Sequence, residues 1–99
     1  MDTWIDDEIR SREEEMIRET LAALKRPSEV QDIQIEFGED HSGNPAVWIK
    51  LSVTNSVRPR SPAWNDVFEY SQEIGQALSE KRLRHWPYVR FHSMAQATN

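Results

Sequence analysis

Apolar and polar residues alternate in two neighbouring segments of the sequence, residues 33–37 and residues 47–53. This period of two is typical of a β-strand that turns one face to a core. Between these segments, residues 38–45 contain glycine, asparagine and proline, which favour a turn. The pattern therefore predicts a β-hairpin with one apolar face. Val30 is out of phase with Ile33, and we expect it to pack just before the first strand.

A helical period of three to four residues precedes the hairpin. Apolar residues at this spacing run from Ile5 to Leu24, and the proline that follows cannot continue a helix. Two starts fit this first helix. A capping box at Thr3 would include the whole segment, whereas a second capping box at Ser11 would leave residues 1–10 as a loose N-terminal arm.

A second helix is predicted after the hairpin, with Ser61 as its cap and Pro62 at its first position. Its apolar stripe is the most regular in the chain and consists of Trp64, Val67, Phe68, Ser71, Ile74, Gly75 and Leu78. Gly75 lowers helix propensity, so we expect it to allow the close approach of another element. Residues 88–92 alternate as a third strand, and residues 93–99 are small and polar and are expected to fray.

The order of elements is therefore α-β-β-α-β. A chain of 99 residues suffices for one domain with one core. A hairpin is only marginally stable alone, so the two helices are expected to cover its apolar face. With a right-handed crossover through the second helix, this order predicts an α+β two-layer sandwich, in which two helices lie on one face of a three-stranded sheet.

The composition restricts the chemistry and the compartment. Cysteine is absent, which excludes disulfides, thiolate metal sites and a cysteine nucleophile and fits a reducing compartment. No apolar run approaches the roughly 18 residues of a membrane span, and the first residues are acidic where a signal peptide would be basic. We expect a cytoplasmic protein without membrane partners.

The two halves of the chain differ in charge. Residues 1–45 hold thirteen acidic against five basic residues, whereas residues 46–99 hold four against seven, so the net charges are −8 and +3. A nucleic-acid footprint usually needs a strongly basic domain. This asymmetry favours attraction between the halves, or between two copies of the chain, over nucleic-acid binding.

No motif in the sequence indicates a reaction. The chain lacks G-x-S-x-G, H-E-x-x-H and a phosphate-binding glycine loop. His41, His85 and His92 are too scattered to propose a triad or a zinc site, and surface or interface positions are their default. His92 and Glu36 are the one pair of residues that would suit general acid–base catalysis. We expect a protein that is not an enzyme and has no cofactor.

Two acidic segments have structural interpretations. Residues 13–15 are three consecutive glutamates, which predict a solvated helix face. Residues 38–45 offer oxygen ligands but lack the alternating acidic spacing of a calcium loop, so we expect no metal there. In this loop Gly43 and Asn44 are residues that tolerate a positive φ in a turn.

The face of the predicted sheet opposite the helices is the strongest functional candidate. An exposed tryptophan and an exposed tyrosine on an open sheet require an explanation. A protein interface supplies one, because aromatic residues and arginine are enriched at such interfaces. We therefore expect self-association as a homodimer, or docking of a protein partner, through Glu36, Trp48, Lys50, Tyr88, Arg90 and His92. Gln34 shares this face, and Trp48 covered by a loop is the remaining alternative.

The alternative function is nucleic-acid binding, with bases stacked on the aromatics of the sheet. Its phosphate-binding residues would be Arg58, Arg60, Lys81, Arg82 and Arg84. A resemblance in the last quarter of the chain supports this nucleic-acid-binding alternative. The residues that carry the resemblance are Gly75, Leu78, Leu83, Arg84, Pro87, Val89 and Phe91. These residues resemble the final helix and strand of the ribosome-binding factor A family, which has a KH-like fold and assists assembly of the small ribosomal subunit. The resemblance implies RNA contact from the basic end of the second helix.

Overall fold

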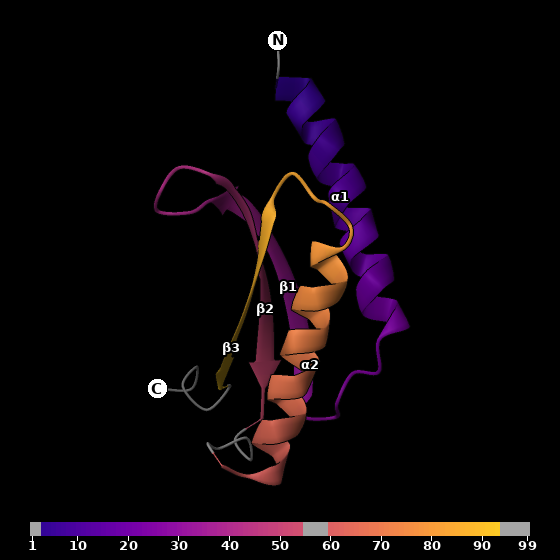
Figure 1. Ribbon diagram of the computed structural model, residues 1–99, viewed down its shortest axis with the longest axis vertical. Helices are drawn as coiled ribbons and strands as arrows, with labels where there is room; N and C mark the ends of the chain where they lie inside the picture. The colour runs from indigo at the N-terminus through magenta and orange to yellow at the C-terminus, as the bar shows by residue number, and fades with distance from the viewer. Residues whose placement is uncertain (1–2, 55–59, 94–99) are drawn as a thin grey trace.

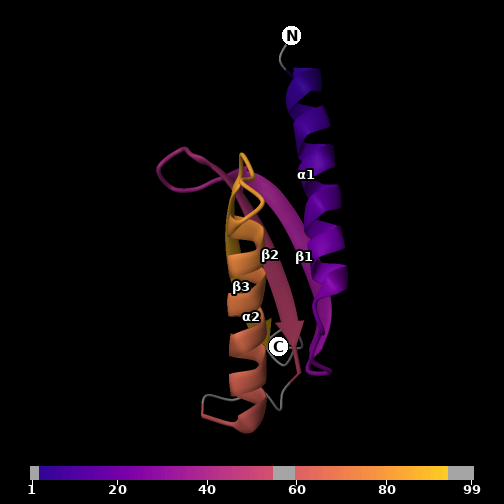
Figure 2. The same cartoon turned by 45° about the vertical axis from the view of Figure 1, so that its right-hand side comes forward.

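A three-stranded sheet forms one layer of the molecule and two helices form the other (Figure 1). The structure is a computed structural model that describes residues 3–54 and 60–93. In chain order its elements are α1 (Thr3–Ala23), β1 (Val30–Glu39), β2 (Pro45–Val53), α2 (Pro62–Ser79) and β3 (Trp86–Ser93). Both helices lie on the same side of the sheet (Figure 2). The predicted α+β class and element order are confirmed.

The central strand is β2, which is antiparallel to β1 and parallel to β3. The short turn after β1 allows the antiparallel pair, and the crossover through α2 produces the parallel one. A register shift between Val30 and Asp32 marks a β-bulge at the start of β1. The extra residue of the bulge shifts the alternation of inward and outward side chains by one position. Val30 is therefore only 2% exposed, although its position in the sequence is out of phase with Ile33. Val30 thus belongs to the strand rather than preceding it.

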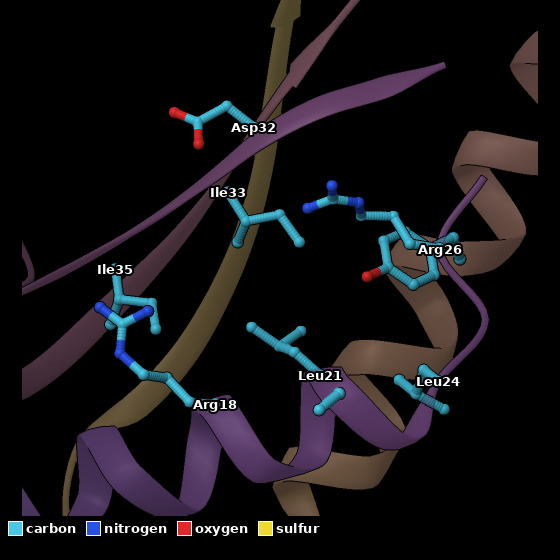
Figure 3. Close-up of a pocket in the computed structure, with 9 residues that line it drawn as sticks. Arg18, Leu21, Leu24, Arg26, Asp32, Ile33 and Ile35 are labelled. Carbon is cyan, nitrogen blue, oxygen red and sulfur yellow. The ribbon is translucent and has the colours of Figure 1, made fainter. Parts of the chain in front are cut away.

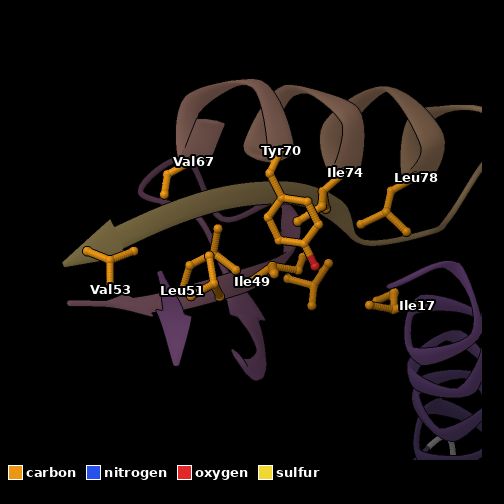
Figure 4. Packing of buried hydrophobic residues seen from close by; sticks show 10 residues of the cluster. Ile17, Ile49, Leu51, Val53, Val67, Tyr70, Ile74 and Leu78 are labelled. Atoms are coloured by element: carbon orange, nitrogen blue, oxygen red, sulfur yellow. The ribbon is translucent and has the colours of Figure 1, made fainter. Parts of the chain in front are cut away.

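The hydrophobic core lies between β2 and the helices (Figure 4). The strand β2 has a neighbour on each edge, so its inward side chains are the best protected of the sheet. The buried cluster consists of Ile17, Val30, Val47, Ile49, Leu51, Val53, Val67, Tyr70, Ile74 and Leu78. Apart from Val30, the inward residues of β1 and β3 are only partly buried, because these strands are the edges of the sheet.

The helix α2 begins as the sequence predicts. The Ser61 hydroxyl accepts a hydrogen bond from the Trp64 N–H at 3.0 Å, and Pro62 is the first helical residue. The predicted apolar stripe is wrong at one position, since Phe68 is 45% exposed and Tyr70, which the pattern omits, is 2% exposed. The buried residues of α2 are Val67, Tyr70, Ile74 and Leu78. Phe68 lies outside this narrower stripe and stacks on Trp64, with ring centroids 6.4 Å apart.

The backbone at the glycines contradicts one prediction, at Gly75, and confirms another, at Gly43. Among residues 3–54 and 60–93, and leaving aside its own helix backbone and chain neighbours, a Cβ at Gly75 would have no heavy atom within 4 Å, so no described element approaches it closely. Gly43 has the expected positive φ, at 84°, but Asn44 does not. The non-glycine residues with positive φ in the described parts of the chain are Arg60, at 71°, and Arg82, at 54°. Both adjoin α2, one before its start and one after its end.

The helix α1 has the earlier of the two predicted starts, so Thr3 to Arg10 are helical rather than a loose arm. It ends at Ala23, before Pro27. Ile17 is fully buried, whereas Leu21 is only partly buried, so α1 is less deeply packed than α2. No helix in residues 3–54 and 60–93 combines the length and apolarity needed to cross a membrane. Of the predicted frayed tail at residues 93–99, Ser93 is instead the last residue of β3, and residues 94–99 lie outside the described residues.

Candidate functional site

The six residues predicted to bind a partner share the side of the sheet that faces away from the helices. We call this side the open face. Cross-strand register places Trp48 between Glu36 and Tyr88, and it places Lys50 opposite Arg90 in the next row. His92 follows opposite Ser52. Gln34 lies opposite Lys50, as expected. Alternation along the strands and their register therefore bring the predicted set together.

Two aromatic side chains form the centre of the open face. The rings of Trp48 and Tyr88 are stacked, with centroids 6.0 Å apart and an interplanar angle of 20°. The indole also lies over Gly38, because a Cβ built there would be 3.2 Å from Trp48 Cζ3. An aromatic ring that covers a strand glycine replaces the packing that the missing side chain would give. Trp48 is thus held in place and half-buried before any partner binds.

The phenol of Tyr88 is fixed by Asp40 in the β1–β2 turn. Its hydroxyl donates a hydrogen bond to Asp40 Oδ2 at 3.3 Å. Asp40 Oδ1 accepts hydrogen bonds from the backbone N–H groups of Ser42 and Asn44, each at 2.9 Å. The Asn44 N–H is the largest cause of a lowered Asp40 pKa, whereas desolvation followed by the Asp40 charge raises the Tyr88 pKa. One oxygen of Asp40 therefore stabilises the turn, and the other joins the turn to Tyr88 on β3.

Charged residues surround the aromatic pair. Lys50 Nζ lies 3.2 Å from Glu36 Oε2 across the β1–β2 pair. His92 Nε2 lies 3.4 Å from the Ser52 hydroxyl, and Arg90 is exposed. Glu36 and His92 are on opposite edge strands and two rows apart, so about 10 Å across the sheet and about 13 Å along it separate them. The structure does not bring this pair together for acid–base chemistry.

The residues of the nucleic-acid alternative do not form one patch. Arg60 precedes α2, whereas Lys81, Arg82 and Arg84 follow it. The 18 residues of α2 span about 27 Å, which separates the two groups. Arg58 lies outside the described residues. The sequence also has no G-x-x-G, the loop with which KH domains hold a nucleic-acid backbone.

Sequence reasoning missed one polar cluster, which joins α1 to the α2–β3 connection. Glu13 is only 7% exposed, so the prediction of a solvated face is wrong at that residue. Its carboxylate accepts hydrogen bonds from the Arg84 N–H at 2.5 Å and the His85 N–H at 3.3 Å. His85 Nδ1 is 2.7 Å from Glu13 Oε1, and the ring packs edge-on against Phe37 at 5.0 Å. His85 is therefore a half-buried structural residue rather than a surface histidine.

A signal for this cluster is present in the sequence. Ile9, Glu13 and Ile17 are spaced by four residues, so Glu13 stands in the apolar stripe where that stripe lapses. A charged residue in such a position needs a partner when the helix packs. The partners of Glu13 are more than 70 residues away in the chain, and only the fold reveals them.

Within the described residues, no group of three or more histidine, aspartate or glutamate side chains is placed to hold a metal ion. Comparison with protein-family models, curated proteins and solved structures found no match to this chain. The resemblance to the ribosome-binding factor A family therefore stays a prediction. The candidate function rests on the geometry of the open face.

Proposed function

We propose that this chain is a small non-catalytic interaction protein that forms a homodimer through its open face. The observation that carries the proposal is the Trp48–Tyr88 stack on a side of the sheet that neither helix covers. Tryptophan, tyrosine and arginine dominate the binding energy of protein interfaces. Since Gly38 and Asp40 already hold the two rings, binding would order few side chains and lose little conformational entropy.

The arrangement of charge favours a second copy as the partner. A two-fold axis brings the same surface of both copies together, so this surface must carry complementary groups. The open face has Glu36 at one edge strand and Arg90 at the other, with Lys50 between them. A two-fold axis parallel to the strands and near the aromatic pair would place the acidic edge of each copy against the basic edge of the other. A different protein partner on the same face is the alternative, and it leaves the isolated chain monomeric.

The test is the mass of variants measured by light scattering on a sizing column. Trp48→Glu places a charge at the centre of the proposed interface, so it should give a lower assembly mass than the unchanged protein. Phe68→Glu is the matched control, because Phe68 is a 45% exposed aromatic residue of α2 and lies on the helix side of the sheet, away from the open face. It should retain the dimer.

Trp48→Glu also uncovers Gly38, so a second variant guards against loss of folding. Arg90→Glu reverses an exposed charge at the edge of the same face and leaves the stack intact. It should weaken dimerisation at least tenfold, while circular dichroism remains that of the unchanged protein. A dimer that tolerates both Trp48→Glu and Arg90→Glu would remove the open face from the interface.

A further inference from the structure

A groove between α1 and β1 lies on the other side of the sheet from the open face (Figure 3). Its walls are aliphatic side chains of both elements, including Leu21 from α1 and Ile33 and Ile35 from β1. These side chains are only partly buried, because α1 does not pack closely over the edge strand β1 and a groove remains between them. The cavity has a volume of about 390 Å³. Small-molecule sites usually measure about 300 to 1,000 Å³.

A buried hydroxyl without a partner borders this groove. Tyr70 reaches from α2 toward the sheet and is 2% exposed, and its hydroxyl makes no hydrogen bond within the described residues (Figure 4). Buried polar groups are nearly always paired, so this exception needs an explanation. Burial is the main cause of a raised Tyr70 pKa. The hydroxyl therefore keeps its proton at neutral pH and is available as a donor.

Positive charge stands at both ends of the groove. Arg18 and Arg26 line it, and Figure 3 shows both guanidinium groups reaching toward the aliphatic walls. Arg18 is already bound to Glu14, with an N–O distance of 2.8 Å. Arg26 makes no ion pair with any described residue. After burial, which raises the pKa of the Tyr70 hydroxyl, the Arg26 charge has the largest effect on that pKa and lowers it, ahead of Glu73, which raises it. Asp32 also lines the groove, and Figure 3 shows its carboxylate on the opposite side of β1 from Ile33 and Leu21.

We propose that this groove binds an aliphatic carboxylate, such as a medium-chain fatty acid. The carboxylate accepts hydrogen bonds from the Tyr70 hydroxyl and the Arg26 guanidinium, and the alkyl chain lies along Leu21, Ile33 and Ile35. Such a ligand gives the buried Tyr70 hydroxyl an acceptor and the exposed Arg26 an ion-pair partner, and it removes the partly exposed aliphatic surface from water. The site is independent of the open face and does not require dimerisation.

The experiment is calorimetric titration of the full chain with octanoate, decanoate and dodecanoate below their micelle concentrations. Each methylene buried in the groove should raise affinity about threefold to fourfold. Decanol, which lacks the carboxylate, should bind at least tenfold more weakly than decanoate. No measurable binding of any of the three acids, or equal binding of decanol, would overturn the proposal.

Two variants assign the carboxylate contacts. Tyr70→Phe keeps the buried ring and removes only the hydroxyl, so it should weaken decanoate binding about tenfold. The same change should raise the melting temperature of the ligand-free protein, because an unpaired buried hydroxyl is lost. Arg26→Gln should also weaken binding at least tenfold. Arg12→Gln removes the same charge from an exposed position of α1 and should leave binding unchanged.

A spectroscopic measurement also distinguishes binding of decanoate in the groove from general adsorption to apolar surface. Nuclear magnetic resonance signals of Leu21, Ile33 and Ile35 should shift with decanoate, while those of Trp48 stay in place. A decanoate affinity that neither Tyr70→Phe nor Arg26→Gln reduces would contradict the assignment. Tighter binding of an acetylated leucine tripeptide with a free carboxylate would also overturn it, because the occupant would then be a peptide C-terminus.

Discussion

Single residues in this protein differ sharply in what surrounds them, and two glycines show the contrast. Gly38 lies under the indole of Trp48, so an added Cβ would come within 3.2 Å of a ring carbon. Gly75 lies in the middle of α2 with open space where a Cβ would stand, and its φ is not positive. The first glycine supports the aromatic stack, whereas the second only lowers the stability of a helix.

Gly75→Ala should therefore stabilise the protein. Alanine has the higher helix propensity and meets no neighbour at this position, so the free energy of unfolding should rise by about 1 kcal/mol. Urea denaturation followed by circular dichroism measures the change. Gly38→Ala is the opposing control, and it should lower the free energy of unfolding because Trp48 must move. A loss of stability in Gly75→Ala would mean that another element packs against this position.

Glu13 is the polar residue on which the α2–β3 connection most depends. Glu13→Ala leaves the N–H groups of Arg84 and His85 without their acceptor in a partly buried site. The free energy of unfolding should fall by about 1 to 3 kcal/mol. Glu15→Ala is the matched control, since Glu15 is exposed on the same helix and its loss should change stability by less than about 0.5 kcal/mol. Thermal denaturation of both variants makes the comparison, and equal effects would show that the Glu13 contacts are not formed.

Asp40 should contribute to the acid dependence of stability. Its pKa in the folded protein is lowered from the usual 3.8, first by the Asn44 N–H. A lowered folded-state pKa gives stability that is present above the unfolded value and is lost as the pH falls through the folded value. Stability of the unchanged protein should therefore decrease below about pH 4, and Asp40→Asn should flatten that decrease. Urea denaturation between pH 2 and 6 tests this, and identical pH profiles would contradict it.

At the scale of elements, periodicity predicted most of the fold. Strict alternation in β1 and β2 specified which side chains share a face, and Ser61 with Pro62 specified the start of α2. Because the side-chain period of a strand is two, the six residues of the open face followed once the three strands were placed. Their placement was therefore predictable from sequence, although their binding to a partner is a proposal.

Other features depend on contacts that no local pattern contains. The β-bulge near Val30 changes the alternation by one residue, and the sequence gives only a residue out of phase. Tyr70 replaces Phe68 in the buried stripe because α2 presents a narrower face to the sheet than its apolar residues indicate. The Glu13–His85 pair joins residues 72 positions apart, so the lapse in the α1 stripe predicts a need for partners without identifying them.

At the scale of the whole molecule, the two sides of the sheet have different roles. One side packs β2 against both helices and leaves a groove beside α1 with the unpaired Tyr70 hydroxyl. The other side presents a fixed aromatic pair on β2 and β3, with an acidic residue on the edge strand β1 and a basic residue on the edge strand β3. The fold does not need this second side for its core, so its aromatic residues are available to a partner.

The mass of the unchanged protein, measured by light scattering across a range of concentrations, tests the central claim most directly. The chain has a mass of 11.6 kDa, so self-association through the open face predicts a species of twice that mass. Absorbance read at 260 and 280 nm in the same run detects bound nucleic acid. A dimer without excess absorbance at 260 nm is the predicted result. A monomer at every concentration would contradict homodimerisation, and a monomer with excess absorbance at 260 nm would favour the RNA-binding alternative.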